Sequence, residues 1–86
     1  MNVVYKYELC GGTTVAPLRE NDKVLSVDVQ GSNAVMWVLI DTDSPHKERY
    51  FQVVYTGERF HGMGWSYVGT FTLDSLVYHV FETPNP

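Results

Sequence analysis

Residues that would identify a metal or redox site are scarce in this sequence. Cys10 is the one cysteine among 86 residues, so the chain cannot form an internal disulfide and lacks the ligands of a cysteine-based zinc site. The three histidines, His46, His61 and His79, share no ligand spacing. We therefore predict no metal and no cofactor. Cys10 is expected to be a half-buried thiol that packs as a small hydrophobic side chain, and His79 a half-buried histidine with satisfied hydrogen bonds.

Basic residues are also few. The chain has six Lys and Arg residues against ten Asp and Glu residues, which gives a net charge of −4. A protein that binds nucleic acid needs a basic stripe to displace counterions from phosphates, and six scattered residues do not form one. We predict that nucleic acid is not a partner.

Long apolar runs are missing as well. The longest, AVMWVLI, has seven residues, far below the roughly 20 that a membrane-spanning helix needs. The first residues, MNVVYKYELCGG, lack the charged start and long apolar run of a secretory signal. The sequence therefore predicts an intracellular protein with no membrane partner.

No stretch shows the helical spacing of apolar residues. Segments rich in β-branched and aromatic residues follow one another instead, separated by Gly, Pro, Asn and Asp. We predict an all-β fold of six to seven mostly antiparallel strands, arranged like a meander and forming a small barrel or compact sandwich. The chain is expected to be a single domain over residues 1–86, with an ordered core at about 3–82 and a frayed tail at 83–86. The predicted strands are 3–9, 13–15, 23–30, 34–41, 49–55, 67–73 and 76–82.

Several local features refine this prediction. Gly11 and Gly12 are expected to form a tight turn between paired strands, and Pro17 is expected to end the second strand. Leu25, Val27 and Val29 should share one face of their strand. Residues 41–48 are expected to be a polar loop, and Gly69 should mark a bulge, a bend or a close approach of two backbones.

The segment AVMWVLID, residues 34–41, is apolar on both faces of the predicted strand. Such a strand either lies between two layers of one chain or carries one face into a contact between subunits. We expect a homo-oligomer, while the arrangement within one chain remains the competing interpretation.

The stretch TGERFHGMGWSYVGT holds the candidate site. Its loop, about residues 56–66, is long for a small domain in which hairpin loops usually have 2–5 residues. Aromatic, Met and Arg side chains are those that binding surfaces favour. Alternatively, Phe60 and Trp65 simply cap one end of the fold. The predicted binding residues, for a protein or a ligand, are Arg59, Phe60, His61, Met63, Trp65 and Tyr67.

Catalysis is not predicted. The candidate nucleophiles Cys10, Ser44, Ser66 and Ser75 lie in no nucleophile-elbow motif, and no base is placed beside them. The loop glycines fit neither the Walker A nor the dinucleotide fingerprint. A phosphate could still meet Arg59, Lys47 and the backbone N–H groups of the loop while an aromatic ring stacks on a base.

A set of short motifs extends over about residues 3–82: a K-V-L-S-V-x-V-Q strand, an apolar strand with Trp that ends near Asp-x-Asp, V-x-T-G, Y-V-G-T and a closing V-x-H-V-F-E. In these features the sequence resembles a family of short, uncharacterised domains that is common in bacteriophage genomes. The loop after T-G reads ERFHGMGWS here, where the relatives often carry a His-Pro pair. No site residues are implied by the resemblance.

The resemblance implies a phage-encoded accessory protein in the cytoplasm of a host bacterium. We expect it to act by binding rather than catalysis, with a host protein as partner, a defence component among the candidates, and the 56–66 loop as the contact. The alternative is an oligomeric protein that sequesters a nucleotide-like small molecule, with Trp65 or Tyr67 stacking and Arg59 pairing with phosphate. A structural component of the virion is a further alternative.

Overall fold

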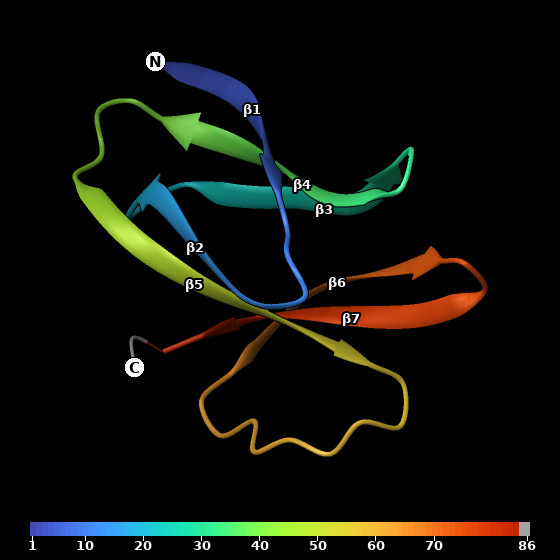
Figure 1. Ribbon diagram of the computed structural model, residues 1–86. Helices are drawn as coiled ribbons and strands as arrows, with labels where there is room; N and C mark the ends of the chain where they lie inside the picture. The colour runs from blue at the N-terminus through green and yellow to red at the C-terminus, as the bar shows by residue number, and fades with distance from the viewer. Residues whose placement is uncertain (85–86) are drawn as a thin grey trace.

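The computed structural model describes residues 1–84 and contains seven β-strands in two sheets (Figure 1). Every strand pair is antiparallel, and the sheets do not close into a barrel. The predicted all-β class is confirmed, and of the two predicted shapes the structure has the sandwich. The strands are β1 (Asn2–Glu8), β2 (Gly12–Arg19), β3 (Lys23–Gln30), β4 (Asn33–Asp41), β5 (His46–Tyr55), β6 (Ser66–Leu73) and β7 (Leu76–Thr83).

The three-stranded sheet has the order β1-β4-β3 and the four-stranded sheet the order β2-β5-β7-β6. Consecutive strands are neighbours only in the β3–β4 and β6–β7 hairpins, so the expected meander is wrong. The connections after β1, β2 and β4 pass between the sheets, which stacks two apolar faces on each other. Gly12 does have a positive φ of 89° at the first connection, but β1 and β2 belong to different sheets and do not pair.

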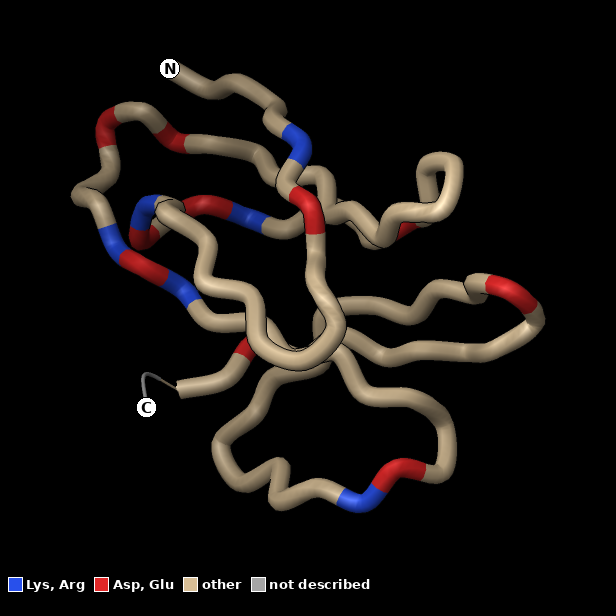
Figure 2. Tube along the Cα trace, in the orientation of Figure 1, with Lys and Arg blue, Asp and Glu red and all other residues tan. Residues whose placement is uncertain are grey.

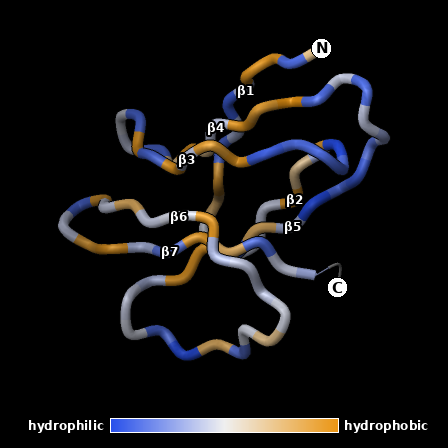
Figure 3. The backbone as a smooth tube through the Cα atoms, turned by 180° about the vertical axis from the view of Figure 1, so that it is seen from behind, coloured by the Kyte–Doolittle hydropathy of each residue, from blue (hydrophilic) through white to orange (hydrophobic). Residues whose placement is uncertain are grey.

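The core lies between the sheets and draws on both. β4 is the central strand of its sheet, and its inward side chains Met36, Val38 and Ile40 are 0%, 0% and 6% exposed. Figure 3, in which the backbone is coloured by residue hydropathy, shows hydrophobic residues along this strand. Burying these side chains is the main driving force for the fold. The buried cluster comprises Leu9, Ala16, Leu18, Met36, Val38, Ile40, Phe51, Phe71 and Val80.

The outward side of β4 is also apolar, with Val35, Trp37 and Leu39 in alternation. Val35 is only 1% exposed although it does not belong to the core cluster. The Lys6 ammonium on β1 donates a hydrogen bond to the Gln30 amide oxygen on β3 at 2.7 Å. Because β4 lies between β1 and β3, this bond spans β4, and the aliphatic stem of Lys6 helps to shield the outward side of the strand.

Two predicted boundaries are wrong in the four-stranded sheet. β2 does not end at Pro17 but continues to Arg19, because β2 is an edge strand, where a missing N–H group is tolerated. β5 begins at His46 rather than at 49, so three residues of the expected polar loop are strand. His46, Lys47 and Glu48 are exposed and pair with β2, and a strand with one wet face accepts polar residues.

Two edge strands carry bulges. In β3 the register shifts between Val24 and Ser26, so Leu25 does not share the inward face with Val27 as expected; it is 54% exposed. In β6 the shift lies between Tyr67 and Gly69. A Cβ at Gly69 would lie 2.6 Å from Cγ2 of Val27. The predicted bulge lies directly before Gly69, where β6 contacts β3 of the other sheet. The close neighbour of Gly69 is the Val27 side chain rather than a second backbone.

Charged residues gather at the end of the sandwich where the 20–22 turn meets the 42–45 connection (Figure 2). The Arg49 guanidinium bonds Glu82 through Nε at 2.7 Å and Nη2 at 2.8 Å, and it also donates to the Asp22 carbonyl oxygen. The Glu82 hydrogen bond raises the pKa of Arg49 above its ordinary value. Asp22, only 4% exposed, accepts from the N–H groups of Arg19 and Asp41. This network ties both sheets together at one end.

β7 extends beyond the predicted end of the ordered core. Thr83 closes β7, so the ordered part extends past the expected limit at 82, and the tail residues Asn85 and Pro86 lie outside the described residues. Within residues 1–84, no helix is long and apolar enough to cross a membrane.

Candidate functional site

The segment 56–65 joins β5 to β6, two strands that run parallel because each pairs antiparallel with β7. β5 ends at Tyr55, opposite Tyr78, whereas β6 begins at Ser66, opposite Glu82. The chain must return along β7 before β6 can start, and a tight hairpin cannot join parallel strands. This return accounts for the length of the loop.

The returning loop packs its aromatic residues on the outer face of the four-stranded sheet. Phe60 stacks on Trp65 with ring centroids 5.0 Å apart, and the two rings lie 5.4 and 5.9 Å from Phe81 of β7. Tyr67 of β6 meets Phe81 edge-on at 5.9 Å. We call these four residues the aromatic cluster. Such ring pairs add about 0.5–1.5 kcal/mol each beyond their buried area.

Backbone contacts fix the loop at both ends. The Tyr55 N–H donates to the Glu58 carboxylate at 3.0 Å, and the Glu58 N–H donates to the Tyr55 carbonyl at 3.0 Å. At the other end, the Trp65 N–H donates to the Gly62 carbonyl at 3.0 Å. A Cβ at Gly62 would lie 2.8 Å from the Phe60 ring. Glycine is therefore needed for the stacked position of Phe60.

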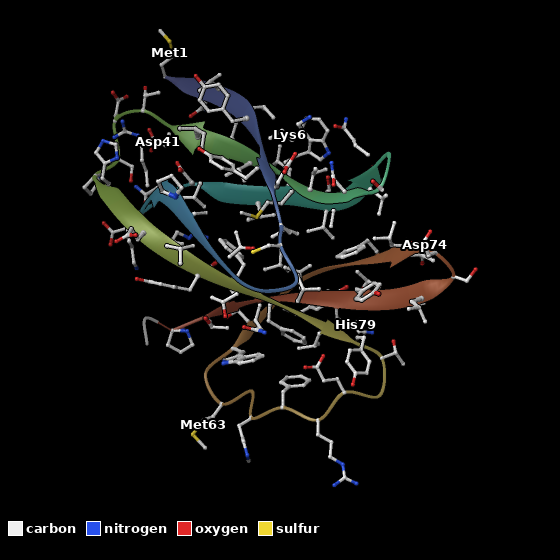
Figure 4. The ribbon with its side chains drawn as sticks, in the orientation of Figure 1. Met1, Lys6, Asp41, Met63, Asp74 and His79 are labelled. Carbon is white, nitrogen blue, oxygen red and sulfur yellow. The ribbon has the colours of Figure 1, made fainter. Side chains whose placement is uncertain are left out.

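Several large apolar side chains of the loop and of β6 are exposed to solvent. Met63 is 93% exposed, Tyr67 62% and Phe60 43%. Figure 4 shows Met63 at the far side of the loop, pointing away from the sheets. We call Phe60, Met63 and Tyr67, together with the neighbouring Arg59, the loop patch. Exposed apolar side chains of this size, gathered on a packed base, are characteristic of interaction surfaces.

Met63 is exposed, and the other five predicted site residues divide into two groups. Phe60, Trp65 and Tyr67 converge on Phe81, as described above. The side chains of Arg59 and His61 are exposed and make no hydrogen bond or ion pair with residues 1–84. Trp65 is half-buried and covers the outer face of a sheet rather than an open end of the fold.

A chain of hydrogen bonds holds Tyr67. Its hydroxyl lies 2.6 Å from Oγ1 of Thr70, which lies 3.2 Å from Nδ1 of His79. Nε2 of His79 lies 2.8 Å from Oγ1 of Thr56, and this hydroxyl donates to the Val77 carbonyl. All these groups are satisfied when Tyr67 donates to Thr70, Thr70 to Nδ1, and Nε2–H to Thr56. The prediction of a half-buried, satisfied His79 is confirmed.

The recesses of the molecule lie away from the loop patch. One, of about 250 Å³, opens between the β3–β4 and β6–β7 hairpins and is lined by Leu9, Cys10, Ala34, Phe71 and Tyr78 among others. Cys10 is exposed rather than half-buried as expected, because it lies in the connection between the sheets. Its sulfur lies 3.2 Å from the Thr13 carbonyl oxygen and from the Thr14 hydroxyl.

The positions of Trp65, Lys47 and Arg59 do not favour the nucleotide pocket considered from the sequence. One face of Trp65 is covered by Phe60, so that face is not open to a base. Lys47 lies near the start of β5, whereas the loop leaves the opposite end of this strand, so Lys47 and Arg59 do not form a common phosphate site. Among residues 1–84, no three His, Cys, Asp or Glu side chains are grouped as metal ligands would be.

Sequence reasoning missed Phe81 as a member of the site. The alternation in β7 does place Val77, His79 and Phe81 on one face, but it does not show that the loop returns over this face. The missing information is the strand order, since only a loop that passes β7 on its way to β6 can reach Phe81.

Comparisons with known proteins identify a family but no characterised relative. No curated protein and no solved structure gives a significant match to the chain. A model of a domain of unknown function, DUF7352, matches residues 1–86. Since the match covers the whole sequence, the chain belongs to the DUF7352 family.

Proposed function

We propose that this protein acts without catalysis, by binding another protein through the loop patch. The observation that carries the proposal is the exposure of Met63, Tyr67 and Phe60 on a rigid aromatic base. Large apolar side chains in water are costly for a free protein and favourable at a contact. The packed cluster holds Phe60 in place, and the hydroxyl chain holds Tyr67, which reduces the entropy that these two side chains lose on binding.

The chemistry of the patch defines its partner. Met63 and Phe60 require an apolar recess, and Met adapts to irregular surfaces because it is unbranched and polarisable. Arg59 has no partner within residues 1–84, and its guanidinium would pair with a carboxylate on the other protein. The resemblance to phage-encoded domains supports a bacterial host protein, with a defence component as one candidate.

Affinity capture from a bacterial lysate tests the proposal with matched variants. Met63→Glu places a charge in the patch, whereas Leu76→Glu places the same charge at an exposed site, 57% accessible, in the β6–β7 hairpin. We expect the wild type and Leu76→Glu to retain a partner protein. The amount of partner captured by Met63→Glu should fall by roughly tenfold or more. Equal retention by all three would contradict the proposal.

The sequestering alternative is separated by thermal denaturation. A nucleotide-like ligand at about a hundred times its Kd would stabilise the folded chain by about 2.7 kcal/mol and raise Tm. We expect no such rise with a panel of nucleotides, because Phe60 already stacks on one face of Trp65 and Lys47 and Arg59 do not form a common phosphate site. A rise that Tyr67→Ala abolishes would favour sequestration instead, and recovery of the protein in purified particles would favour the virion role.

A further inference from the structure

The free edge of β1 is the one sheet edge without an interruption in the part of the chain that the structure describes (Figure 1). Residues Asn2–Glu8 pair with β4 without a register shift. Register shifts interrupt the edge strands β3 and β6, and the edge strand β2 contains Pro17, which has no N–H group. β2 also belongs to the other sheet and hardly contacts β1. A regular row of backbone donors and acceptors is therefore open along β1.

The ladder between β1 and β4 shows which backbone groups are open. The Leu9 N–H donates to the Ala34 carbonyl oxygen at 2.9 Å. At the other end, the Thr42 N–H donates to the Met1 carbonyl oxygen at 3.0 Å. Bonded and non-bonded pairs alternate along an antiparallel ladder, so the odd-numbered residues of β1 bond β4. The outward N–H and C=O groups belong to the exposed residues Asn2, Val4, Lys6 and Glu8, and no hydrogen bond to these groups occurs within residues 1–84. Such a row is completed by another extended strand.

The apolar side chains of β1 match those of a second β1 when the two strands run antiparallel about Tyr5. Val3 then lies opposite Tyr7 of the second copy, and Tyr5 lies opposite Tyr5. Aromatic and β-branched pairs of this kind are favourable cross-strand contacts. Tyr5 is 55% exposed although it shares a side of β1 with Val3 and Tyr7, which pack against the core. The pairing would cover this exposed ring.

The charged side chains on the other side of β1 select the same register. About Tyr5, Glu8 lies opposite Asn2 of the second copy and Lys6 lies opposite Val4, so no like charges stand directly opposite each other. The two Lys6 residues are diagonal neighbours, but each ammonium extends over β4 to Gln30, away from the edge. An axis at Lys6 would instead set Lys6 directly against Lys6, which is unfavourable.

The remaining charges near β1 do not oppose this register. Asp41 lies beside Asn2 on β4, and it would stand two strand spacings, about 10 Å, from Glu8 of the second copy. Salt screens exposed charges at about this distance. The N-terminal ammonium at this end is paired with Asp43. On the core side, Arg19 and Asp22 are held by hydrogen bonds within the chain.

We propose that β1 pairs with β1 of a second copy, antiparallel about Tyr5, so that two three-stranded sheets join into one. A second copy is the fitting occupant because the open edge supplies both the complementary backbone row and a register free of opposed charges. One strand pair of this length covers less than the roughly 800 Å² per partner of a standard interface. We therefore expect a dimer that forms reversibly with rising concentration. The proposal is independent of the loop patch, which lies on the outer face of the other sheet.

Sedimentation velocity from micromolar to near-millimolar concentration tests the edge with matched proline variants. Val4 and Val15 are 49% and 48% exposed on edge strands of different sheets, and the N–H group of each points away from its sheet. Proline at either position therefore removes no ladder bond within the chain. We expect Val4→Pro to weaken the dimer by roughly tenfold or more, and Val15→Pro to leave it unchanged. A wild-type chain that stays monomeric, or a dimer that Val4→Pro leaves intact, would overturn the proposal, even if β1 bound a strand of another protein.

Amide hydrogen exchange followed by NMR tests the pairing on the unmodified chain. At low concentration, the N–H groups of Val3, Tyr5 and Tyr7 should be protected by β4, whereas the N–H groups of Val4 and Lys6 exchange fast. At high concentration, the N–H groups of Val4 and Lys6 should become protected as well. A dimer that leaves these two groups in fast exchange would show that the contact lies elsewhere.

Disulfide trapping tests the register. In a Cys10→Ser background with oxidised glutathione, Tyr5→Cys should form a disulfide between two copies, because non-bonded antiparallel partners have Cα atoms about 4.5 Å apart. Lys6→Cys should react roughly tenfold more slowly or less, since diagonal neighbours lie beyond the span of a disulfide. Faster trapping through Lys6→Cys, or no trapping through Tyr5→Cys, would overturn the arrangement about Tyr5.

Discussion

At the scale of single residues, the two ion pairs among residues 1–84 contribute differently to stability. Arg49 and Glu82 have side chains only 13% and 28% exposed and form a two-point contact. The N-terminal ammonium and Asp43 are 90% and 82% exposed. Exposed pairs contribute little because water and salt screen them, whereas loss of one partner from a sheltered pair leaves the other charge without compensation.

We therefore expect Glu82→Gln to lower the free energy of unfolding by about 1–3 kcal/mol. Gln keeps the shape but removes the charge that faces Arg49. Asp43→Asn, as the control, should leave the urea midpoint unchanged. Urea denaturation at neutral pH measures both, and a Glu82→Gln variant as stable as the control would show that the Arg49 guanidinium finds water or another acceptor.

At the scale of strands, the approach of β6 to β3 depends on a missing side chain. Gly69 has an ordinary φ, but an added Cβ would lie 2.6 Å from Val27 Cγ2. Valine cannot swing its methyl groups away freely, since it is branched at Cβ. The bulge beside Gly69 and the contact between the sheets therefore belong together.

Gly69→Ala should destabilise the domain by about 1–3 kcal/mol, because the two sheets must separate locally. Gly11→Ala is the control, since its Cβ would meet nothing within 4 Å. Thermal denaturation compares the two, and Val27→Ala in the Gly69→Ala background should recover part of the loss. If Gly69→Ala matched Gly11→Ala, the contact between β3 and β6 would be looser than the structure shows.

Strand identities were predictable because alternation and turn residues are local signals. Residues 23–30 form β3 as expected, and the hairpin turns at 31–32 and 74–75 follow from Gly31, Asp74 and Ser75. Edge positions, bulges and strand order depend on other parts of the chain. The continuation of β2 through Pro17 and the outward side chain of Leu25 could not be predicted for this reason.

The candidate site was predictable only as a set of residues. The loop residues Phe60, Trp65 and Tyr67 do meet, but their common partner Phe81 follows from the strand order. Arg59 and His61 were chosen by residue type, and residue type alone does not show whether two side chains converge. The geometry therefore narrows the predicted set to a patch centred on Phe60, Met63 and Tyr67.

At the scale of the whole molecule, the free energy of unfolding should decrease at alkaline pH. Burial raises the pKa of the Tyr7 phenol above its ordinary value of 10, and the Asp22 carboxylate acts in the same direction. The folded state thus holds the phenolic proton more tightly than the unfolded state does. The resulting stability is complete below about pH 10 and decreases as pH rises through the folded pKa.

We expect Tyr7→Phe to reduce the loss of stability above about pH 10, because no proton is then released on unfolding at this position. Urea midpoints measured at neutral and at alkaline pH give the comparison. The variant should match the wild type in slope at neutral pH and differ only in the alkaline range. An unchanged alkaline loss would mean that other groups control it.

The edges of the two sheets have a consequence for how copies of this chain meet. β3 and β6 are interrupted by bulges, and β2 carries Pro17, so three of the four edge strands offer a broken row of backbone donors and acceptors. Such interruptions hinder the addition of a foreign strand and the growth of cross-β aggregates. Templated growth through these three edges is therefore obstructed, although both sheets carry exposed apolar side chains.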